Sequence, residues 1–340
     1  MRITVLLGGT SSERDVSLAS GLRIAAALRS RGHEVTAVDT ARGALSAAEE
    51  AAMLAGTLMK TLPPEQEALA RLSAETLPAT ARRLPAAGTT DVVFLGLHGG
   101  TGEDGTIQAL LDMTGVPYTG SGHLASALAM DKDLSKHLFR QAGIPTADWM
   151  MAPVTDIEVV TALGLPVIVK PSKQGSTVGL TLVKRAEDLQ SAISLALEYD
   201  DEVMIERFIP GRELTVGILG DEALPVGEII AAHEIYDYEC KYTAGMAREE
   251  FPARLTADEA ATVQSLSKRA FRALKLSGYA RIDFRMTSDG TFYCLEANTL
   301  PGMTELSLIP QAAAAAGIGF AELCERIVQL AVRRRTGEGR

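Results

Sequence analysis

Cysteine and long apolar runs are both scarce in this sequence, and each scarcity excludes a class of protein. The 340 residues contain three cysteines, Cys240, Cys294 and Cys324, which are too few and too scattered for a disulfide framework and form no CxxC pair. We therefore expect a reducing, cytoplasmic setting. No stretch approaches the roughly 18 consecutive apolar residues of a membrane span, so we expect no transmembrane segment.

Basic charge is also in the minority. Acidic side chains number 43 against 33 basic ones, which gives a formal net charge of −10 at pH 7. This balance argues against nonspecific binding to nucleic acid or to an anionic membrane, so we expect no partner of either kind. A polyanionic ligand would have to find its positive charge locally.

The composition is otherwise that of a folded protein, with 46% hydrophobic and 22% charged residues. In the first third, the short apolar runs 3–7, 34–38 and 92–97 alternate with helical patterns, which is typical of a parallel α/β sheet. Residues 41–89 are predicted to form two helices without a motif. The length favours two or three domains.

Residues 279–298 carry the strongest strand signal. Two alternating runs flank Asp289-Gly290, a dipeptide typical of two-residue hairpin loops, and such a loop pairs Ser288 with Thr291. The register that follows places Asp283 across from Glu296, and Arg281 across from Asn298, on one face of the hairpin. The alternation predicts that the other face is core and consists of Ile282, Phe284, Met286, Tyr293, Leu295 and Ala297.

Two opposed carboxylates, Asp283 and Glu296, repel each other by up to about 1 kcal/mol in an ordinary sheet. Arg281 and Arg285 could neutralise them in a solvated, salt-bridged face. The alternative is a divalent cation, because carboxylates and the amide of Asn298 are hard oxygen donors that suit Mg²⁺ or Mn²⁺ rather than zinc. The second interpretation makes the hairpin a platform for a metal and a phosphate.

Three glycine-rich segments follow apolar strands. Residues 170–179 let the backbone approach an anion while Lys170 and Lys173 supply charge, although an ordinary loop with solvated lysines would look the same. Residues 8–17 and 98–105 lie where open α/β sheets bind ligands.

Three other motifs were weighed and set aside. Residues 120–125 fit G-x-G-x-x-A, but no acidic residue follows at the dinucleotide-binding offset. His98-Gly-Gly100 is not accompanied by a G-x-S-x-G nucleophile elbow. No Walker A motif occurs. A dinucleotide-binding fold, a serine hydrolase and a P-loop enzyme are therefore disfavoured.

Together, seven ordered motifs resemble D-alanine–D-alanine ligases of the ATP-grasp superfamily, over residues 3–332. They are GGTSSERDVS (8–17), LHGGTGEDG (97–105), YTGSG (118–122), MDK (130–132), VKPS (169–172), YDYECKY (236–242) and EANTLPGMT (296–304). The resemblance implies an α/β protein with the ATP-grasp fold: an N-terminal parallel α/β substrate domain (1–120), a central subdomain (121–205) and a C-terminal subdomain with the metal hairpin (206–335), the last two enclosing ATP.

The resemblance also implies the reaction. ATP phosphorylates the carboxylate of one D-alanine, and the amine of a second attacks this acyl phosphate to give the dipeptide for peptidoglycan. Two Mg²⁺ or Mn²⁺ ions would be held by Asp283, Glu296 and Asn298. The nucleotide would be contacted by Lys132, Lys170, Glu206, Phe208, Ile209, Glu213 and Lys241.

For the amino-acid substrates, the resemblance implies that Glu13, helped by His98, holds the ammonium of the first alanine. Ser307 meets the carboxylate of the second. Arg281 and the Gly302 backbone stabilise the tetrahedral intermediate. Two further residues, Ser176 and Tyr242, would join the central glycine-rich loop to a lid formed by about residues 236–251.

Two alternatives remain. Tyr242 favours the dipeptide over D-alanyl-D-lactate, while Glu305, near the second substrate, leaves other D-amino acids open. An ATP-binding regulatory protein with the same fold is disfavoured because it would not need the full set of Arg281, Asp283, Glu296 and Asn298. A homodimer is expected from the family alone.

Overall fold

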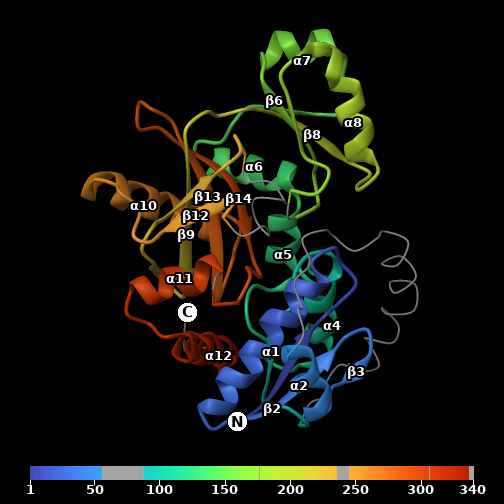
Figure 1. Ribbon diagram of the computed structural model, residues 1–340, viewed down its shortest axis with the longest axis vertical. Helices are drawn as coiled ribbons and strands as arrows, with labels where there is room; N and C mark the ends of the chain where they lie inside the picture. The colour runs from blue at the N-terminus through green and yellow to red at the C-terminus, as the bar shows by residue number, and fades with distance from the viewer. Residues whose placement is uncertain (56–84, 86–87, 176, 236–244, 306, 337–340) are drawn as a thin grey trace.

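The computed structural model describes residues 1–55, 85, 88–175, 177–235, 245–305 and 307–336, which form three sheets with their helices (Figure 1). The predicted site residues Ser176, Lys241 and Tyr242 lie outside the described residues, as does most of the 41–89 segment. In the described part of the chain, no helix is long and apolar enough to cross a lipid bilayer.

The N-terminal sheet is parallel at its centre, as predicted. Its order is β3-β2-β1-β4, and β1 runs parallel to both β2 and β4 because helices connect them. Its strands are β1 (Arg2–Leu7), β2 (Glu34–Asp39), β3 (Gly43–Ala44) and β4 (Val92–Leu95), and its helices are α1 (Arg14–Ser30), α2 (Ala47–Ala55), η1 (Gly100–Gly102) and α4 (Thr106–Thr114).

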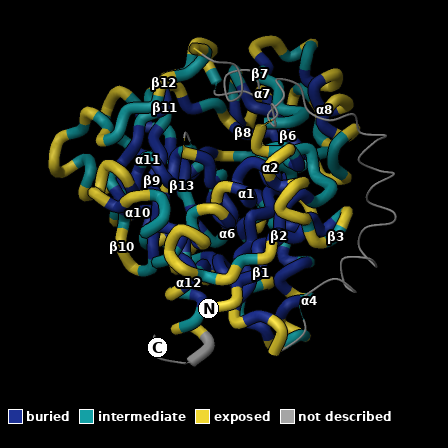
Figure 2. The backbone as a smooth tube through the Cα atoms, turned by 60° about the horizontal axis from the view of Figure 1, so that its bottom comes forward, coloured by how far each residue is buried: buried dark blue, intermediate teal, exposed yellow. Residues whose placement is uncertain are grey.

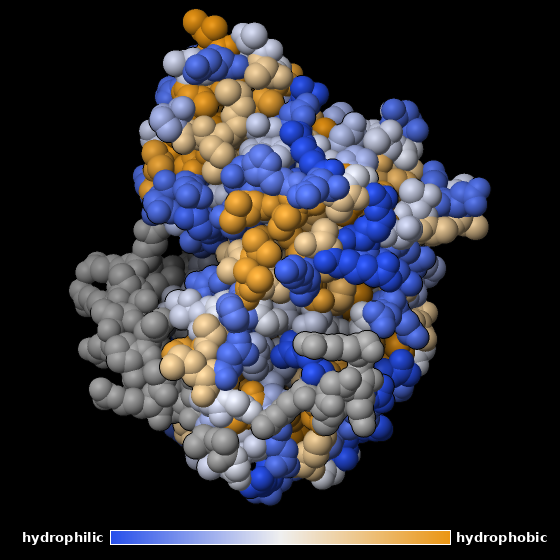
Figure 3. All heavy atoms as spheres, turned by 180° about the vertical axis from the view of Figure 1, so that it is seen from behind, coloured by the Kyte–Doolittle hydropathy of each residue, from blue (hydrophilic) through white to orange (hydrophobic). Residues whose placement is uncertain are grey.

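The central sheet is antiparallel throughout, in the order β5-β8-β6-β7, and lies at the top of Figure 1. It consists of β5 (Trp149–Met151), β6 (Val167–Pro171), β7 (Thr181–Val183) and β8 (Val203–Arg207), with α7 (Asp156–Ala162), η2 (Ala186–Asp188) and α8 (Leu189–Leu197). Several large apolar side chains of this unit are exposed, among them Ile157, Val160 and Leu197. The face drawn in Figure 3 shows hydrophobic patches interspersed with hydrophilic ones.

The C-terminal sheet has the order β12-β11-β9-β13-β14, with β10 beside β9. It contains β9 (Arg212–Leu219), β10 (Glu222–Ala223), β11 (Gly227–Ala231), β12 (Ala247–Glu250), β13 (Tyr279–Met286) and β14 (Phe292–Asn298). The remaining helices are α5 (His123–Met130), α6 (Lys132–Gln141), α10 (Ala257–Ala273), α11 (Leu308–Ala315) and α12 (Phe320–Thr336).

Between residues 123 and 141 the chain forms two consecutive helices, α5 and α6, rather than one. Asp131 between them has an extended backbone, and its side chain accepts a hydrogen bond from Leu134 N, so it caps α6. Both helices share a buried core with the C-terminal sheet, through residues such as Ala129 and Phe139, rather than with the central sheet.

The buried apolar side chains form three cores of unequal size. One core joins the N-terminal sheet to Leu300, Ile309 and the inner face of α12, which packs against α1. The central sheet has a smaller core of its own, built around Val167 and Ile205. Figure 2 shows the buried segments gathered in the middle of the molecule. The N- and C-terminal units are therefore fused, whereas the central unit is separate.

The hairpin of β13 and β14 has the predicted register at the end that carries Asp283 and Glu296. The reason for this register differs from the predicted one. Asp283 pairs with Glu296 and Arg281 with Asn298, but the register shifts by one residue after Asp283. The loop is one residue longer than predicted, since Thr287 pairs with Thr291 rather than Ser288. A bulge at Leu295 cancels this difference.

Because of the bulge, the core face of β14 differs from the predicted one. Phe292, Cys294 and Ala297 are buried on β14, whereas Tyr293 and Leu295 are only partly buried. The predicted placement of Tyr293 and Leu295 in the core is therefore wrong, and Leu295 instead lines a cavity.

Candidate active site

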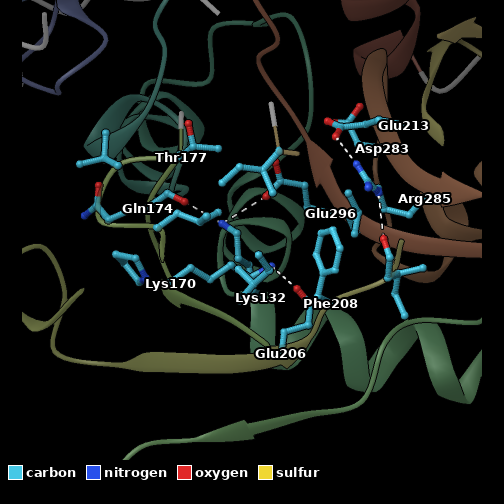
Figure 4. A pocket seen from close by; sticks show the side chains of 18 of the residues that line it. Lys132, Lys170, Gln174, Thr177, Glu206, Phe208, Glu213, Asp283, Arg285 and Glu296 are labelled. Atoms are coloured by element: carbon cyan, nitrogen blue, oxygen red, sulfur yellow. Dashed lines mark hydrogen bonds and ion pairs between the residues drawn. The ribbon is translucent and has the colours of Figure 1, made fainter. Parts of the chain in front are cut away.

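A cavity lies between the central and C-terminal sheets (Figure 4). Nine residues that were predicted as site residues from the sequence line it: Lys132, Lys170, Glu206, Phe208, Ile209, Glu213, Arg281, Asp283 and Glu296. They come from α6, β6, β8, the β8–β9 connection, β9, β13 and β14. The fold therefore brings together residues that are far apart in the chain, up to the 164 positions between Lys132 and Glu296.

Glu206 is a buried carboxylate held between two lysines. Lys170 Nζ donates to its Oε2 at 2.5 Å, and Lys136 Nζ donates to its Oε1. Burial alone would raise the pKa of Glu206, but the charges and hydrogen bonds of Lys136 and Lys170 outweigh it and lower the pKa to about 2. Glu206 is therefore a permanent anion, and an acceptor only, at neutral pH.

Lys132 joins the glycine-rich loop to the metal hairpin. Its Nζ donates to the carbonyl oxygen of Gln174 at 2.6 Å and lies 3.3 Å from Glu296 Oε2 (Figure 4). It begins α6 directly after the Asp131 cap, which fixes where its side chain leaves the backbone. A cation is thus held at the mouth of the loop that was predicted to bind phosphate.

Asp283 is surrounded by donors. Arg281 binds both of its oxygens, with Nε 2.9 Å from Oδ1 and Nη2 2.8 Å from Oδ2. Thr215 Oγ1 donates to Oδ1 at 2.7 Å, and Asn298 Nδ2 donates to Oδ2 at 2.9 Å. The opposed carboxylates are therefore compensated by Arg281 on Asp283 and by Lys132 on Glu296 in this structure.

The set Asp283, Glu296 and Asn298 fits a hard divalent cation, because all three side chains offer oxygen donors on neighbouring positions of one hairpin. Among the described residues, no group of three or more His, Cys, Asp or Glu is arranged to hold a metal ion, so the amide of Asn298 is needed to complete the set. A cation bound here would compete with Arg281 for Asp283.

A second arginine shapes the far side of the cavity. Arg285 donates to Glu213 Oε2 and to the Ile209 carbonyl oxygen, each at 3.1 Å, and its guanidinium lies 5.4 Å from the centre of the Phe208 ring. These contacts hold the β8–β9 connection against β13. Arg285 was predicted only as a possible neutraliser of the hairpin carboxylates; the structure places it on Glu213 instead.

Glu13 adjoins this cavity from the N-terminal unit. A Cβ atom added to Gly99 would lie 2.7 Å from Glu13 Oε2, and one added to Gly175 would lie 3.1 Å from it. The carboxylate therefore sits where the 98–105 loop and the 170–179 loop meet. A side chain at Gly99, whose φ is +63°, would be strained and would displace this carboxylate, whereas one at Gly175 would require a shift of only a few tenths of an ångström.

His98 connects two loops through both ring nitrogens. Nδ1 donates to the Leu300 carbonyl oxygen at 2.7 Å. Nε2 lies 2.9 Å from Ser20 Oγ, which itself accepts a bond from Met303 N, so the serine hydroxyl donates to the ring. Burial lowers the pKa of His98, against the opposing influence of Glu13. The imidazole is thus neutral and fully engaged within the protein.

Glu103 holds the same two loops together from another side. Its Oε1 accepts from Thr299 N and Leu300 N, both at 3.0 Å, and its Oε2 accepts from Gly99 N at 3.1 Å. Burial raises the pKa of Glu103 to about 7, the charge of Glu13 adds to this shift, and the backbone donors act against it.

Gly302 and Ser307 lie next to each other at the start of α11. A Cβ atom on Gly302 would lie 2.9 Å from Ser307 Oγ. Ser307 Oγ accepts from Thr304 N at 3.0 Å and is 2.8 Å from Thr304 Oγ1. Gly302, Ser307, Glu13, His98 and Asn298 do not line this cavity. Asn298, at the end of β14, contacts the lining residue Asp283, and Glu13 lies beside the lining residue Gly175.

Two family models match this chain over most of its length. "D-ala D-ala ligase N-terminus" matches residues 2–121, and "D-ala D-ala ligase C-terminus" matches residues 138–329. The chain therefore belongs to the D-alanine–D-alanine ligase family.

Curated relatives and solved structures agree with this assignment. The D-alanine--D-alanine ligase of Geobacter sulfurreducens is 43% identical over 341 residues, covering 99% of this chain and 96% of the relative. That of Geotalea uraniireducens is 42% identical, covering 97% and 95%. Among solved structures, the Bacillus anthracis ligase complexed with ATP is 35% identical, with a TM-score of 0.77 and coverage of 100% and 99%. The Coxiella burnetii ligase is 27% identical, with a TM-score of 0.81 and coverage of 99% and 95%. The ATP-grasp fold expected from the sequence is thereby confirmed.

Two interactions of this site were not predicted from the sequence. Lys136 belongs to none of the motifs considered, and Glu103 lies within the 98–105 segment but was given no role of its own. A signal for Lys136 exists: Lys132, Lys136 and Phe139 share one face of α6, and a lysine in line with a buried aromatic requires a buried partner. For Glu103, the sequence gives no sign of two of its three backbone donors, Thr299 N and Leu300 N, because they lie almost 200 positions away in the chain.

Proposed function

We propose that this protein joins two D-alanine molecules into D-alanyl-D-alanine with ATP, through an acyl phosphate, for peptidoglycan synthesis. The observation that carries the proposal is the cavity in which Lys132, Lys170 and Arg281 face Asp283 and Glu296, in a chain of the D-alanine–D-alanine ligase family. Phosphoryl transfer needs cations around the transferred group and carboxylates to hold its metal, and both are present.

ATP would lie in this cavity, with its triphosphate near Lys132 and Lys170 and its base near Phe208 and Ile209. Two Mg²⁺ or Mn²⁺ ions, held by Asp283, Glu296 and Asn298, would neutralise the developing charge on the phosphates. Glu213, whose carboxylate Arg285 holds, would meet the ribose. Lys241 belongs to the same nucleotide site in this proposal.

Arg281 would have two positions in the reaction. In the structure it neutralises Asp283, and its guanidinium lies in the cavity wall. With a cation held by Asp283, Arg281 would be available to face the carboxylate of the first alanine and, with the Gly302 backbone, the oxyanion that forms on amine attack. The same guanidinium would then serve both Asp283 and the reacting groups.

The substrate side is built from loops of the N- and C-terminal units. Glu13 would receive the ammonium of the first alanine at the meeting point of three loops. His98 would act by holding the 98–105 loop on Leu300 and Ser20, since both of its nitrogens are engaged. Ser307 would bind the second carboxylate after giving up Thr304, and Ser176 and Tyr242 would close the lid.

The setting of the protein is part of the same proposal. We expect a cytoplasmic homodimer whose small-molecule partners are ATP and D-alanine. The ligase family supports this setting, and sedimentation of the purified protein would test the dimer.

The decisive experiment measures phosphate release from ATP with Mg²⁺, adding D-alanine, L-alanine, D-lactate or other D-amino acids in turn. We expect release that depends on D-alanine, with the dipeptide identified by mass spectrometry. Preferred use of D-lactate as second substrate would replace the proposal by a D-alanyl-D-lactate ligase. ATP binding without any release would indicate a regulatory protein.

A further inference from the structure

Lys136 is a lysine with no exposed surface, placed directly against the anion of the nucleotide cavity. Its side chain is 0% exposed and Glu206 is 4% exposed. Its Nζ donates to Glu206 Oε1 and, at 2.6 Å, to Thr146 Oγ1. The Thr146 hydroxyl in turn donates to the carbonyl oxygen of Cys294 at 2.8 Å. The ammonium is therefore anchored from both sides.

Lys170, the other partner of Glu206, differs in one respect. It lines the cavity, whereas Lys136 does not. A ligand that enters the cavity can attract the Lys170 ammonium away from Glu206 Oε2. It does not reach Lys136, whose side chain has no exposed surface and does not line the cavity.

We propose that Lys136 is a positioning residue, the buried counter-ion of Glu206, which frees Lys170 for the phosphates of the nucleotide and keeps Glu206 aimed at the base. This inference rests on the proposed function, because it assumes that a nucleoside triphosphate occupies the cavity.

The consequence is a preference for one kind of base. An ionised carboxylate only accepts hydrogen bonds, so Glu206 favours a base edge that carries an amino group and repels one that carries a carbonyl oxygen. Without Lys136, Lys170 becomes its sole counter-ion. The lysine must then serve either the carboxylate or the phosphates, and Glu206 loses its fixed orientation.

The burial of this pair explains why the effect should be measurable. Charge-assisted hydrogen bonds inside a protein are short and strong, and removing one partner leaves the other charge buried without compensation. The low pKa of Glu206, about 2, supports the same view, because two lysines contribute to it.

The test compares Lys136→Met with Arg140→Met. Arg140 is one helical turn away on α6, and both cations lie over the ring of Trp149, but Arg140 is exposed and binds Asp148 rather than Glu206. Initial rates give KM and kcat for ATP at saturating D-alanine. The inhibition constants of ADP and GDP give the base preference, which a merely structural role of Lys136 would not change.

For Lys136→Met we expect KM for ATP and the inhibition constant of ADP to rise about tenfold or more, because a buried polar partner is lost. The ratio of the GDP to the ADP inhibition constant should fall several-fold, while KM for D-alanine stays within twofold. Arg140→Met should leave all of these values unchanged.

A milder variant protects the test against misfolding. Thr146→Val removes the hydroxyl that anchors Lys136 but keeps the shape and both charges, so it should give the same changes at a few-fold level. Unchanged ADP affinity and base preference in the folded variants would overturn the inference. Absence of D-alanine-dependent turnover in the wild type would instead contradict the proposed function, so the two failures are distinguishable.

Discussion

At the scale of single residues, the site is defined by how each charge is compensated. Asp283 forms an ion pair with Arg281, and Glu296 forms one with Lys132. Glu206 forms ion pairs with both Lys136 and Lys170. Each of these three carboxylates, predicted as metal or nucleotide ligands, is paired with a cation of the protein itself. These ion pairs keep the cost of holding several buried charges low.

The first prediction concerns the metal platform. Asp283→Asn keeps the shape and a hydrogen-bonding oxygen but removes a charge, so we expect the apparent affinity for Mg²⁺ to fall at least about tenfold and turnover to fall with it. Titration of the reaction rate with Mg²⁺ measures this. The control is Asp289→Asn in the loop of the same hairpin, where the side chain accepts from Thr291 N and an asparagine can do the same. Equal Mg²⁺ dependence in both variants would mean that Asp283 is structural.

The second prediction uses the raised pKa of Glu103. Its pKa in the folded protein is about 7, above that of an unfolded glutamate, so the folded state binds the proton more tightly. The corresponding contribution to stability is complete below about pH 4.5 and is lost as the pH rises through 7, a change of about 3 kcal/mol. Glutamine at this position does not titrate.

The stability difference between wild type and Glu103→Gln should therefore depend on pH. Relative to the variant, the wild type should lose stability between pH 5 and pH 8, as measured by urea unfolding at each pH. His98 and Glu13, which lie nearby, are present in both proteins and cancel. Glu222→Gln on exposed β10 should follow the wild type at every pH. If the unfolding free energies of wild type and Glu103→Gln instead changed in parallel between pH 5 and pH 8, Glu103 would be ionised over this whole range.

At the scale of elements, the turns and bulges decide where the site residues lie. The alternating pattern predicted that Asp283 and Glu296 face each other, and they do. The reason for this pairing differs from the predicted one, because alternation along a strand determines the face of a residue only where the strand has no bulge. The extra residue in the loop and the bulge at Leu295 compensate each other. Neither has a signature in local hydrophobicity, so Tyr293 and Leu295 were placed on the wrong face.

The loop after β1 gives a prediction at this scale. Gly8 has φ +81°, and a Cβ atom there would lie 2.5 Å from Asp39 Oδ1 and 2.7 Å from Arg14 Nη1. Those two groups form a buried ion pair beneath the loop that leads to Glu13. Gly32 has φ +84° with nothing within 4 Å of an added Cβ, so it is a matched control.

We expect Gly32→Ala to cost about 1 kcal/mol of unfolding free energy, from backbone strain alone. Gly8→Ala should cost about 1–3 kcal/mol more, because it also forces the buried pair of Arg14 and Asp39 apart. It should raise KM for D-alanine as well, since Glu13 moves with the loop. Urea unfolding and initial rates test both effects, and equal costs for the two variants would disprove the role of the ion pair.

At the scale of the whole molecule, the three units differ in how they are joined. The sequence predicted three units, but helix patterns do not reveal which sheet a helix packs on. The C-terminal helix α12 belongs to the core of the N-terminal sheet, and α5 and α6 belong to that of the C-terminal sheet. Among the described residues, the central sheet has the smallest of the three cores, and none of its residues belongs to the core that joins the N- and C-terminal units. It also carries one wall of the cavity, so a nucleotide bound there as proposed would bridge the part of the molecule that is least well attached.

This arrangement predicts two unfolding transitions in the absence of ligand. The only tryptophan, Trp149, lies on β5 of the central sheet beside Glu206 and contacts α6, so its fluorescence reports whether the central unit is docked. Because a smaller core gives less stability, the fluorescence transition in urea should precede the loss of far-UV circular dichroism. Saturating ADP should bring the two midpoints together, since the ligand stabilises only the docked state.

As a control, Trp149→Phe combined with Phe320→Trp moves the probe to α12, which packs in the N-terminal core, and its fluorescence should follow the circular dichroism. Coincident transitions for both probes without ligand would show that the central unit unfolds together with the rest of the chain.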